Sequence, residues 1–365
     1  MRILQVDSGR EWRGGQHQVW LLCRALGHEE PDTEQVLVTQ RDSELAQRVA
    51  AAGIRVHGTS WDIGLDPRAW WHLRRTIAAF RPDVIHAHDS HALTLAATVA
   101  MGGLGGRGGR TVVATRRVEF HVSRFGAWRR PDRVIAISEA VKRALVADGI
   151  APDAVVVVHD GIDVAEVRRA ATPPLEIRRQ LSIPQAAPLA VNAAALTGEK
   201  DHRTLIRAAH YARARRPDLH WIIAGEGKLR DPLAAEIDRL GLRDRVHLVG
   251  HVDRIDALIA EASVFVLSSR SEGLGSVLLH ALALGRPVVA TRAGGIPEIL
   301  PPEALVPVDA AEPLAQKVVD TLAHATPPGG AGGAGGAGGA GGALPPRFTA
   351  SAMARGVLDV YRALL

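Results

Sequence analysis

The feature that most constrains the fold is an alternation of short β-branched runs with longer stretches of helical periodicity. This alternation is typical of βαβ units, in which helices join parallel strands. In the first half we predict strands at 3–6, 35–38, 55–57, 83–86, 111–114, 133–137 and 155–159, and helices at 16–26, 43–52, 67–80 and 139–148. The last of these helices has clear end signals, because Ser138 precedes it and Gly149 follows it.

The alternation stops in a proline-rich stretch, 172–184, and then restarts. Further strands are predicted at 189–193, 219–224, 246–248, 264–267 and 287–291, and further helices at 202–215, 230–240, 254–261, 276–284 and 311–323. One continuous sheet of so many strands would be unusual. The sequence therefore predicts an α/β protein with two doubly wound parallel sheets, in domains at 1–170 and 185–326.

The end of the chain has a different composition. Only glycine and alanine occupy residues 329–342, so we predict a flexible linker over residues 327–347. Beyond it, apolar residues recur with helical spacing and predict an amphipathic helix at 348–365. A helix on such a tether must dock to be stable, and we expect it to pack against one of the two sheets.

Composition excludes several other classes of protein. Hydrophobic residues make up 47% of the 365-residue chain and charged residues 23%, which excludes a mainly disordered protein. No apolar run reaches the ~18 residues that span a bilayer, and the N-terminus reads as a strand rather than a signal peptide. The single cysteine, Cys23, excludes a disulfide framework, so we expect a cytoplasmic protein.

The charge balance points to no single partner. A net charge of +5 suits an anionic ligand or an anionic membrane face. Aromatic residues make up only 4% of the chain, and no basic-aromatic or zinc-finger motif occurs, so nucleic acid is not expected as a partner. The stretch 120–130 mixes Phe, Trp and Arg, and we consider a peripheral membrane contact there.

The strongest local motif is 268–287, where an apolar strand runs into a glycine-bearing loop that opens a helix. Backbone N–H groups of Gly273, Leu274, Gly275 and Ser276 would point out of the helix start and, with its dipole, form a phosphate site. Glu272 at the edge of the loop could accept hydrogen bonds from hydroxyl groups. An ordinary strand-to-helix turn has the same pattern, so the motif alone leaves both interpretations open.

Three other segments carry weaker signals. Gly14 and Gly15 follow the first strand, at the sheet edge where doubly wound folds bind ligands, although a plain tight turn looks alike. Lys200 follows the first strand of the second half and could neutralise a phosphate. The segment 224–230 resembles a dinucleotide fingerprint, but Arg230 replaces its third glycine, so a nicotinamide cofactor is not expected.

A histidine cluster, His86, His88, Asp89 and His91, suggests a metal site at first sight. The metallo-hydrolase pattern H-x-H-x-D-H would need its aspartate one position later, and no Asp-x-Asp pair occurs in the chain, so we predict no metal. His86 and His88 share one face of a strand, and we expect one of them to face an inter-domain cleft. Arg116 ends another strand and could face the same cleft.

Taken together, these segments resemble the GT-B glycosyltransferases, and specifically glycosyltransferase family 4, the retaining group that uses nucleotide sugars. The resemblance runs through most of the chain and is most specific in the blocks 271–275 and 294–298. It implies two Rossmann-like domains facing a cleft, with the donor bound by the C-terminal one and the acceptor by the N-terminal one. The helix at 348–365 would then pack back on the N-terminal domain.

The resemblance also implies roles for matching residues. Lys200 would bind the donor diphosphate together with the loop 273–276, Glu199 would belong to the same donor site, and Glu272 would contact the transferred sugar. His251, Val252 and Asp253 would lie against the base, and Gly14 and Gly15 would close over the diphosphate. The predicted catalytic residues are Glu272, His88 and Arg116, of which Arg116 is our own expectation and not a residue of the family pattern. No cofactor is implied beyond a UDP-, GDP- or ADP-sugar as co-substrate.

Three positions depart from the family pattern. The second acid of the E-x7-E motif is His280 here, and a neutral imidazole has one acceptor nitrogen where a carboxylate has two acceptor oxygens. The phosphate-binding arginine five residues before the lysine is Ala195, and a histidine after the fifth strand is replaced by Arg116. We expect Arg116 to supply the missing charge, and a glutamate at position 280 to tighten nucleotide binding.

The sequence thus predicts a retaining, metal-independent glycosyltransferase of cell-envelope glycans or lipid-linked saccharides, at the inner face of the membrane or free in the cytoplasm. The alternative is a GT-B protein that binds nucleotide sugars but has lost catalysis, which His280 and Ala195 favour and Glu272 and Lys200 oppose. An epimerase of the same architecture fits the E-x7-E region less well.

Overall fold

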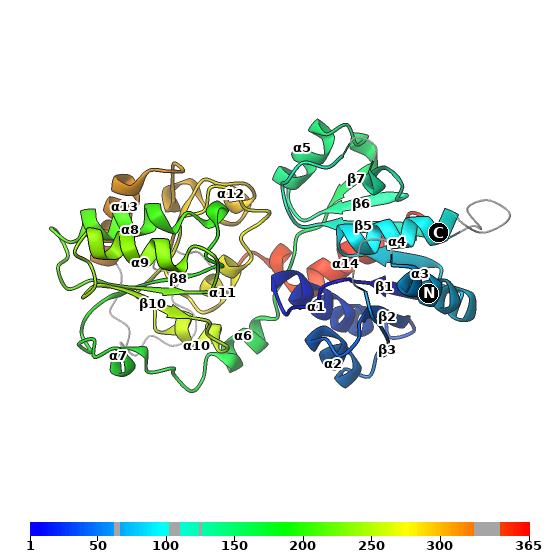
Figure 1. Cartoon of the computed structure of the whole chain (residues 1–365), viewed down its shortest axis with the longest axis horizontal. Helices are drawn as coiled ribbons and strands as arrows, with labels where there is room; N and C mark the ends of the chain where they lie inside the picture. Colours follow the sequence, from blue (N-terminus) through cyan, green and yellow to red (C-terminus); the bar gives the residue numbers. More distant parts are fainter. Residues whose placement is uncertain (62–65, 102–109, 124–125, 325–343) are drawn as a thin grey trace. The chain divides into compact units, whose positions relative to one another are not determined.

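Two separate parallel sheets organise the chain in the computed structural model, which describes residues 1–61, 66–101, 110–123, 126–324 and 344–365. The first sheet belongs to unit 1, made of Met1–Gly161 and Pro346–Leu365, and the second to unit 2, made of Ile162–Pro345 (Figure 1). The predicted fold class, α/β with two doubly wound parallel sheets, is confirmed.

In unit 1 the described strands lie in the order β3-β2-β1-β4-β5-β6-β7, and every neighbouring pair is parallel. Helices cover both faces, with α1, α2 and α14 on one side and α3 and α4 on the other. The strands are β1 (Arg2–Val6), β2 (Glu34–Gln40), β3 (Arg55–Thr59), β4 (Val84–Ala87), β5 (Thr111–Arg116), β6 (Arg133–Ala136) and β7 (Val155–Val157). The helices are α1 (Gly14–Glu29), α2 (Glu44–Ala51), α3 (Pro67–Phe80), α4 (Ser90–Met101), α5 (Glu139–Ala147) and α14 (Ala350–Arg362).

In unit 2 the order is β10-β9-β8-β11-β12-β13, again parallel throughout the described strands. Helices α8, α9 and α13 pack together, as do α6, α10 and α11 (Figure 1). The strands are β8 (Leu189–Ala193), β9 (His220–Ala224), β10 (Val246–Gly250), β11 (Val264–Leu267), β12 (Val288–Thr291) and β13 (Leu305–Val306). The helices are α6 (Val164–Ala170), α7 (Ile177–Gln180), α8 (His202–Ala212), α9 (Arg230–Arg239), α10 (Ile255–Ala260), α11 (Val277–Ala283), α12 (Ile296–Ile299) and α13 (Ala311–His324).

The end signals read from the sequence act as expected in α5. The Ser138 hydroxyl accepts a hydrogen bond from the Val141 N–H at 3.0 Å, which satisfies one of the free donors of the first turn. At the other end Gly149 has φ = 87°, a left-handed conformation that glycine adopts at little cost. Local chemistry therefore fixes where this helix begins and ends.

The final helix, α14, docks on unit 1. Its N-cap Thr349 accepts from the Ala352 N–H at 3.2 Å, and its apolar stripe, including Met353, Val357 and Tyr361, is buried in the same core as Leu22 of α1. Close packing at Gly161 accompanies this docking, because a Cβ there would lie 2.3 Å from the Thr349 carbonyl oxygen. The last helix is thus an integral part of the first unit.

The boundaries of the units differ from the predicted ones. Unit 1 ends at Gly161 rather than residue 170, because α6 packs in unit 2, where Arg168 Nε donates to the Ala283 carbonyl at 3.2 Å. The proline-rich stretch that suggested a domain break lies within unit 2. Residues 329–342, predicted as a flexible linker, lie outside the described residues, and the predicted linker end at 347 falls within a 3-10 turn at Pro346–Phe348.

Candidate active site

Each sheet has one point where its strand order reverses: between β1 and β4 in unit 1, and between β8 and β11 in unit 2. In open α/β sheets, ligands bind at the carboxyl ends of the strands beside this reversal. Lys200 follows β8 and Glu272 follows β11, so residues 72 positions apart in the chain meet at this point in unit 2.

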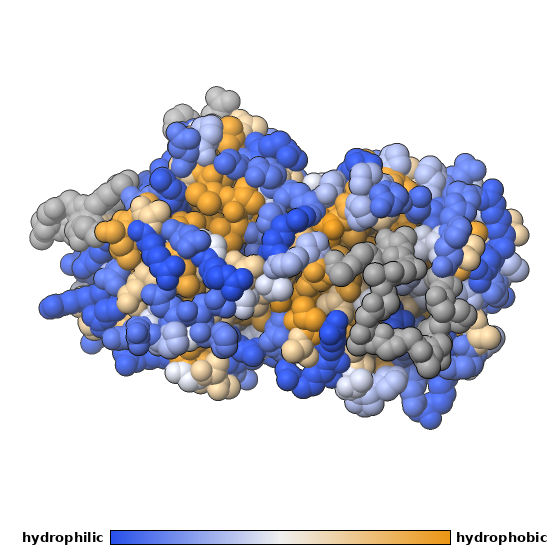
Figure 2. Space-filling view, turned by 180° about the vertical axis from the view of Figure 1, so that it is seen from behind, coloured by the Kyte–Doolittle hydropathy of each residue, from blue (hydrophilic) through white to orange (hydrophobic). Residues whose placement is uncertain are grey.

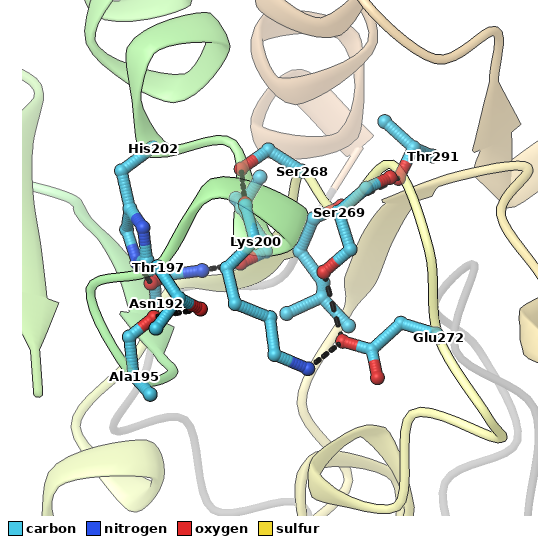
Figure 3. A network of polar contacts seen from close by, with 11 residues as sticks. Asn192, Ala195, Thr197, Lys200, His202, Ser268, Ser269, Glu272 and Thr291 are labelled. Carbon is cyan, nitrogen blue, oxygen red and sulfur yellow. Dashed lines mark hydrogen bonds and ion pairs between the residues drawn. The ribbon is translucent and has the colours of Figure 1, made fainter. Parts of the chain in front are cut away.

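A short polar network joins these two residues (Figure 3). The Lys200 Nζ donates to Glu272 Oε1 at 2.5 Å, and the Ser269 hydroxyl donates to the same oxygen at 2.8 Å. Ser269 is itself held, since the Thr291 hydroxyl donates to its carbonyl at 2.6 Å. The Glu272 side chain is 9% exposed and that of Lys200 23% exposed, so the pair is largely withdrawn from water, and the lysine is the more exposed partner. The structure therefore brings together the ammonium group and the carboxylate that the sequence singled out.

A second set of hydrogen bonds fixes the two loops behind this pair. The Ser268 hydroxyl lies 3.0 Å from the Lys200 carbonyl and 3.1 Å from that of Asp201, which ties the end of β11 to the loop after β8. Asn192 donates to the Val266 carbonyl at 2.9 Å, and its Oδ1 lies 3.1 Å from His202 Nε2. Burial lowers the pKa of His202 to about 4, so the ring is neutral and acts as a structural donor.

The glycine-bearing loop after Glu272 has open amides at Leu274, Gly275 and Ser276, three of the four positions that the motif named. The N–H groups of Leu274, Gly275 and Ser276 donate to no other described part of the chain, and Ser276 provides no side-chain cap for α11. Gly275 has φ = 84°, and a Cβ there would lie 3.2 Å from side-chain carbons of Ile296 and Leu278. The Gly295 N–H donates to the Glu272 carbonyl at 3.1 Å and anchors the loop. Glycine at 275 is thus required by conformation and packing together.

The glycines of 225–227 have a packing role. A Cβ on Gly225, at φ = 145°, would lie 2.0 Å from the Ala194 carbonyl oxygen, and the Leu196 N–H donates to the Glu226 carbonyl at 2.9 Å. This loop therefore supports the segment that leads to Lys200. Glu199 supports it from the other side, because its carbonyl accepts the Arg270 N–H at 2.8 Å. Ala195 is exposed on the same segment and brings no charge to it.

His280 has a partner that the sequence did not indicate. Its Nδ1 lies 2.7 Å from Oδ1 of Asp256 on α10, and both side chains are largely buried. The two residues are 24 positions apart on different helices, and no local pattern links them. A carboxylate is thus present beside position 280, supplied by another helix.

His251, Val252 and Asp253 follow the carboxyl end of β10. His251 Nε2 lies 3.1 Å from Asp253 Oδ1, and the side chains of both residues are exposed to solvent.

In unit 1, Gly14 and Gly15 form the first turn of α1. The N-cap, Arg13, makes no side-chain hydrogen bond to this turn. A Cβ built on either glycine meets no atom within 4 Å, so protein packing does not account for glycine at these positions. Open space above an uncapped helix start is what a close-lying anionic ligand needs.

His86 and His88 lie in the core of unit 1. His86 Nδ1 lies 2.6 Å from the Tyr361 hydroxyl of α14 and its Nε2 2.7 Å from the Thr115 hydroxyl. His88 Nε2 lies 2.7 Å from Gln5 Oε1, and the two imidazole centroids are 4.2 Å apart. Burial lowers the pKa of His86 to about 3 and that of His88 well below its usual value, so both rings are neutral.

The sequence pointed to Asp89 only as part of the histidine cluster and did not single out Asp7, the second carboxylate at the reversal between β1 and β4. Asp89 accepts from the Ser8 N–H at 2.7 Å and from the Ser8 hydroxyl at 2.6 Å, and Asp7 accepts from the Gly9 N–H at 2.9 Å. Burial, with the nearby Asp89 charge, raises the pKa of Asp7 to about 6. The position of Asp7 at the end of the first strand was the available signal, because such residues meet the loop after β4 in this topology.

Arg116 is tied to its own loop. Its guanidinium donates to the carbonyls of Val118 at 3.1 Å and Phe120 at 2.6 Å, and lies 5.0 Å from the Trp128 ring centre. These contacts give Arg116 a structural task, and its catalytic role stays a prediction. The next residue, Arg117, lies 3.5 Å from Asp160 and donates to the His88 carbonyl at 3.2 Å.

Two features are absent from the described residues, a cluster of metal ligands and a membrane-spanning helix. No group of three or more His, Cys, Asp or Glu side chains among them is arranged to hold a metal ion. No described helix combines the length and the apolar character that crossing a bilayer requires.

Each unit of the chain matches a known family model. Residues 6–166 match the family model Glycosyltransferase Family 4, and residues 175–325 match Glycosyl transferases group 1. The structure of HepE from Anabaena, solved in complex with UDP and glucose, superposes with a TM-score of 0.79 at 20% identity and full coverage of both chains. This likeness establishes the GT-B fold, as the sequence predicted.

Curated relatives match over part of their length. The lipopolysaccharide core biosynthesis glycosyltransferase LpsE of Rhizobium meliloti is 36% identical over 118 residues, which are 32% of this chain and 34% of LpsE. Glycogen synthase of Mycobacterium tuberculosis is 30% identical over 244 residues, 61% of this chain and 55% of that enzyme. The chain thus spans between a third and just over half of these two relatives.

Fold and site together define a GT-B protein with two Rossmann-like units. More particularly, the chain is glycosyltransferase family 4-like, since the two family models match one unit each.

Proposed function

We propose that this chain is a retaining, metal-independent glycosyltransferase that moves a sugar from a nucleotide-sugar donor to a saccharide or lipid-linked acceptor of the cell envelope. The observation that carries the proposal is the Lys200–Glu272 pair, with 2.5 Å between Nζ and Oε1, at the strand-order reversal of unit 2. The names of LpsE and of glycogen synthase, and the UDP and glucose bound to HepE, support the same reaction class.

The chemistry of the donor site follows from these groups. A sugar diphosphate carries negative charge that Lys200 and the open amides of 274–276 can stabilise. When the diphosphate binds, the Lys200 ammonium group forms an ion pair with it instead of with Glu272. The Glu272 carboxylate can then accept hydrogen bonds from hydroxyl groups of the transferred sugar. Glycosyl transfer develops negative charge on the leaving group, so stabilising the diphosphate lowers the barrier directly.

The remaining donor contacts are assigned by the resemblance. His251, Val252 and Asp253 receive the base, Glu199 supports the diphosphate loop, and His280 faces the ribose. The base itself, among uracil, guanine and adenine, is left to experiment. The resemblance assigns Gly14 and Gly15 to the diphosphate and the acceptor to unit 1, and His88 and Arg116 are the predicted catalytic residues of that unit.

A place at the inner face of the membrane fits two large exposed apolar side chains of unit 1, Trp71 at 57% and Phe120 at 58% exposure. On the face drawn in Figure 2, hydrophobic residues reach the surface in separate patches among hydrophilic ones. This pattern favours a reversible peripheral contact over permanent burial of one continuous face.

A second candidate function is nucleotide-sugar binding without catalysis. Ala195 and His280 favour it, because the first brings no positive charge and the second has fewer acceptor sites than a carboxylate. Slow hydrolysis of a nucleotide sugar by the purified protein would exclude it. Binding with no turnover, in the presence of envelope saccharides as acceptors, would favour it over the transferase.

The donor site is tested by ligand binding. UDP-, GDP- and ADP-sugars should be screened by thermal shift, because a ligand that binds the folded state raises the melting temperature. Lys200→Ala should weaken binding of the preferred nucleotide sugar about 10- to 100-fold, the usual value of a charged hydrogen bond. Lys317→Ala, on α13 of the same unit, is the matched control and should bind as the wild type does. Equal affinity in the two variants would refute this placement of the diphosphate.

A further inference from the structure

Arg270, in the loop that follows β11, forms ion pairs with two aspartates from different parts of unit 2. Its Nε lies 3.2 Å from Oδ2 of Asp201, the residue after Lys200. It also pairs with Asp309, which follows β13. The side chains of Arg270 and Asp309 are half exposed, whereas that of Asp201 is only 3% exposed. Because a buried carboxylate needs a counter-charge, Asp201 is the partner that depends most on Arg270.

The backbone of Arg270 holds the same segment at a second point. The Arg270 N–H donates to the Glu199 carbonyl at 2.8 Å, so one residue contacts the positions immediately before and after Lys200. Ser268, two residues earlier, reaches the carbonyls of Lys200 and Asp201 at 3.0 and 3.1 Å. The end of β11 therefore holds the Lys200 segment through both its backbone and its side chains.

The Lys200 segment is weakly held by its own hydrogen bonds. The Lys200 N–H donates to the Thr197 carbonyl and the Asp201 N–H to the Gly198 carbonyl, each at 3.3 Å. Both distances exceed the usual value of about 2.9 Å. Asp201 also has φ = 44°, a left-handed conformation that is unfavourable for a residue with a Cβ. A turn of this kind keeps its shape when other parts of the chain hold it.

The charges around Asp201 balance one another. Burial raises the pKa of the Asp201 carboxyl, and the Arg270 charge acts in the opposite direction. The hydrogen bond to Asp309 and the charge of Asp201 raise the pKa of Arg270, so the guanidinium stays protonated. Without the guanidinium, the ionised Asp201 carboxylate would be buried beside no counter-charge and would be driven toward water. Such a movement would also shift the adjacent Lys200.

We infer that Arg270 is a positioning residue of the donor site, which acts through Asp201 to hold the Lys200 ammonium group where it meets both Glu272 and a bound diphosphate. The inference rests on the proposed transferase function, which assigns the diphosphate to Lys200. Arg270 acts on the segment 199–201 and does not itself contact the ligand. Loss of its guanidinium therefore weakens donor binding only while residue 201 carries a charge.

The test measures binding of UDP, GDP and ADP to the full chain by calorimetry and continues with the nucleotide that binds most tightly. Arg270→Met should weaken its binding about 10-fold, the scale of one impaired charged hydrogen bond. Arg270→Lys keeps a positive charge and should weaken binding less than Arg270→Met does. Arg243→Met, which removes an exposed arginine paired with Asp238 on α9, is the matched control and should bind as the wild type does.

A second substitution shows whether Arg270 acts through Asp201. Asparagine tolerates the left-handed conformation and caps a helix as aspartate does, but it has no charge. Asp201→Asn alone should bind as the wild type does, and Asp201→Asn with Arg270→Met should restore binding to within about 2-fold of it. A general loss of stability caused by Arg270→Met would persist in this double variant, and so would the loss of a direct contact between Arg270 and the nucleotide.

The possible failures of the inference and of the proposed function differ. Equal affinity of Arg270→Met and the wild type would overturn the positioning role and leave the donor site standing. Binding that stays weak in the double variant would also overturn this role, because Arg270 would then act by another route. A wild type that binds none of the three nucleotides would overturn the proposed function itself, and with it the inference.

Discussion

Lys200 and Glu272 neutralise one another in the ligand-free protein, and this pairing has a chemical use. A lysine at a largely buried position costs desolvation unless a counter-charge lies beside it, and Glu272 provides that charge at 2.5 Å. An arriving diphosphate replaces one anion by another around the same ammonium group. Ser269 keeps Glu272 in place during this exchange, because its hydroxyl remains hydrogen-bonded to the carboxylate at 2.8 Å.

The residue at position 280 shows how a substitution read from sequence depends on its neighbour. His280→Glu was expected to tighten nucleotide binding, but Asp256 lies 2.7 Å from the imidazole, and two carboxylates there would repel each other. We therefore expect little gain from His280→Glu alone and a gain of about 10-fold from His280→Glu with Asp256→Asn. Calorimetric titration with the preferred nucleoside diphosphate measures both, and Asp256→Asn alone is the control. A gain that is as large in the single variant as in the double would contradict the assigned pairing.

Asp7 makes the stability of the folded protein depend on pH. Its folded-state pKa of about 6 lies above the ordinary 3.8, so between these values the folded protein holds a proton that the unfolded chain has released. This group therefore lowers stability as pH rises from about 4 to 6, and the loss persists above pH 6. Asp7→Asn should raise the melting temperature at pH 7.5 and change it little at pH 4.

The difference in melting temperature between Asp7→Asn and the wild type isolates the contribution of Asp7. His86 and His88, whose pKa values burial lowers, contribute with the opposite sign, because stability rises as the unfolded histidines lose their protons. Both proteins contain them, so their contribution cancels in the difference. Asp32→Asn, at an exposed position of the same unit, is the matched control. A difference between Asp7→Asn and wild type that is equal at both pH values would exclude the raised pKa.

At the scale of elements, the strands and helices followed from the sequence wherever local chemistry marks them. Periodicity placed most of them, and capping residues such as Ser138 marked the helix ends. The glycine-bearing loop after Glu272 could also be predicted, because a strand, glycines and a helix follow one another over 268–287. Contacts made by distant residues were not readable: nothing near His280 indicates Asp256, and nothing near His86 indicates Tyr361. Such pairs arise when tertiary packing joins elements, and one sequence carries no record of which elements meet.

The contact between α14 and β4 is one of these distant pairs and can be tested. The Tyr361 hydroxyl lies 2.6 Å from His86 Nδ1, and both side chains are fully buried. Tyr361→Phe keeps the ring but leaves a buried nitrogen without its partner, which should lower the free energy of unfolding by about 1–3 kcal/mol. Urea denaturation measures the change. Tyr211→Phe, on α8 with a half-exposed ring, is the control and should change it by less than about 0.5 kcal/mol. Equal effects of the two substitutions would argue against the buried contact.

At the scale of the whole molecule, the order of the chain differs from the order of the units. Unit 2 is inserted between β7 and α14 of unit 1, so the first unit is completed only by the last residues of the chain. The sequence indicated a docking helix by its apolar spacing, and the resemblance to family 4 implied where it docks. The predicted end of the first domain, residue 170, differs from the end of unit 1 at Gly161. The prediction relied on the proline-rich stretch, and such a stretch marks a break in periodicity and not the end of a folding unit.

Because unit 2 is inserted into unit 1, we predict that removing α14 destabilises unit 1 and leaves unit 2 unchanged. Removing residues 346–365 uncovers the face of α1 that Met353, Val357 and Tyr361 cover, and it takes from His86 a buried hydrogen-bond partner. Hydrogen exchange should then lose protection in β1 and α1 while β8 and β11 keep theirs, and binding at the Lys200 site should persist. Removing only Leu365, which is 65% exposed, is the control and should leave the exchange pattern unchanged. Retained protection of α1 in the truncated chain would mean that the first unit is complete without its last helix.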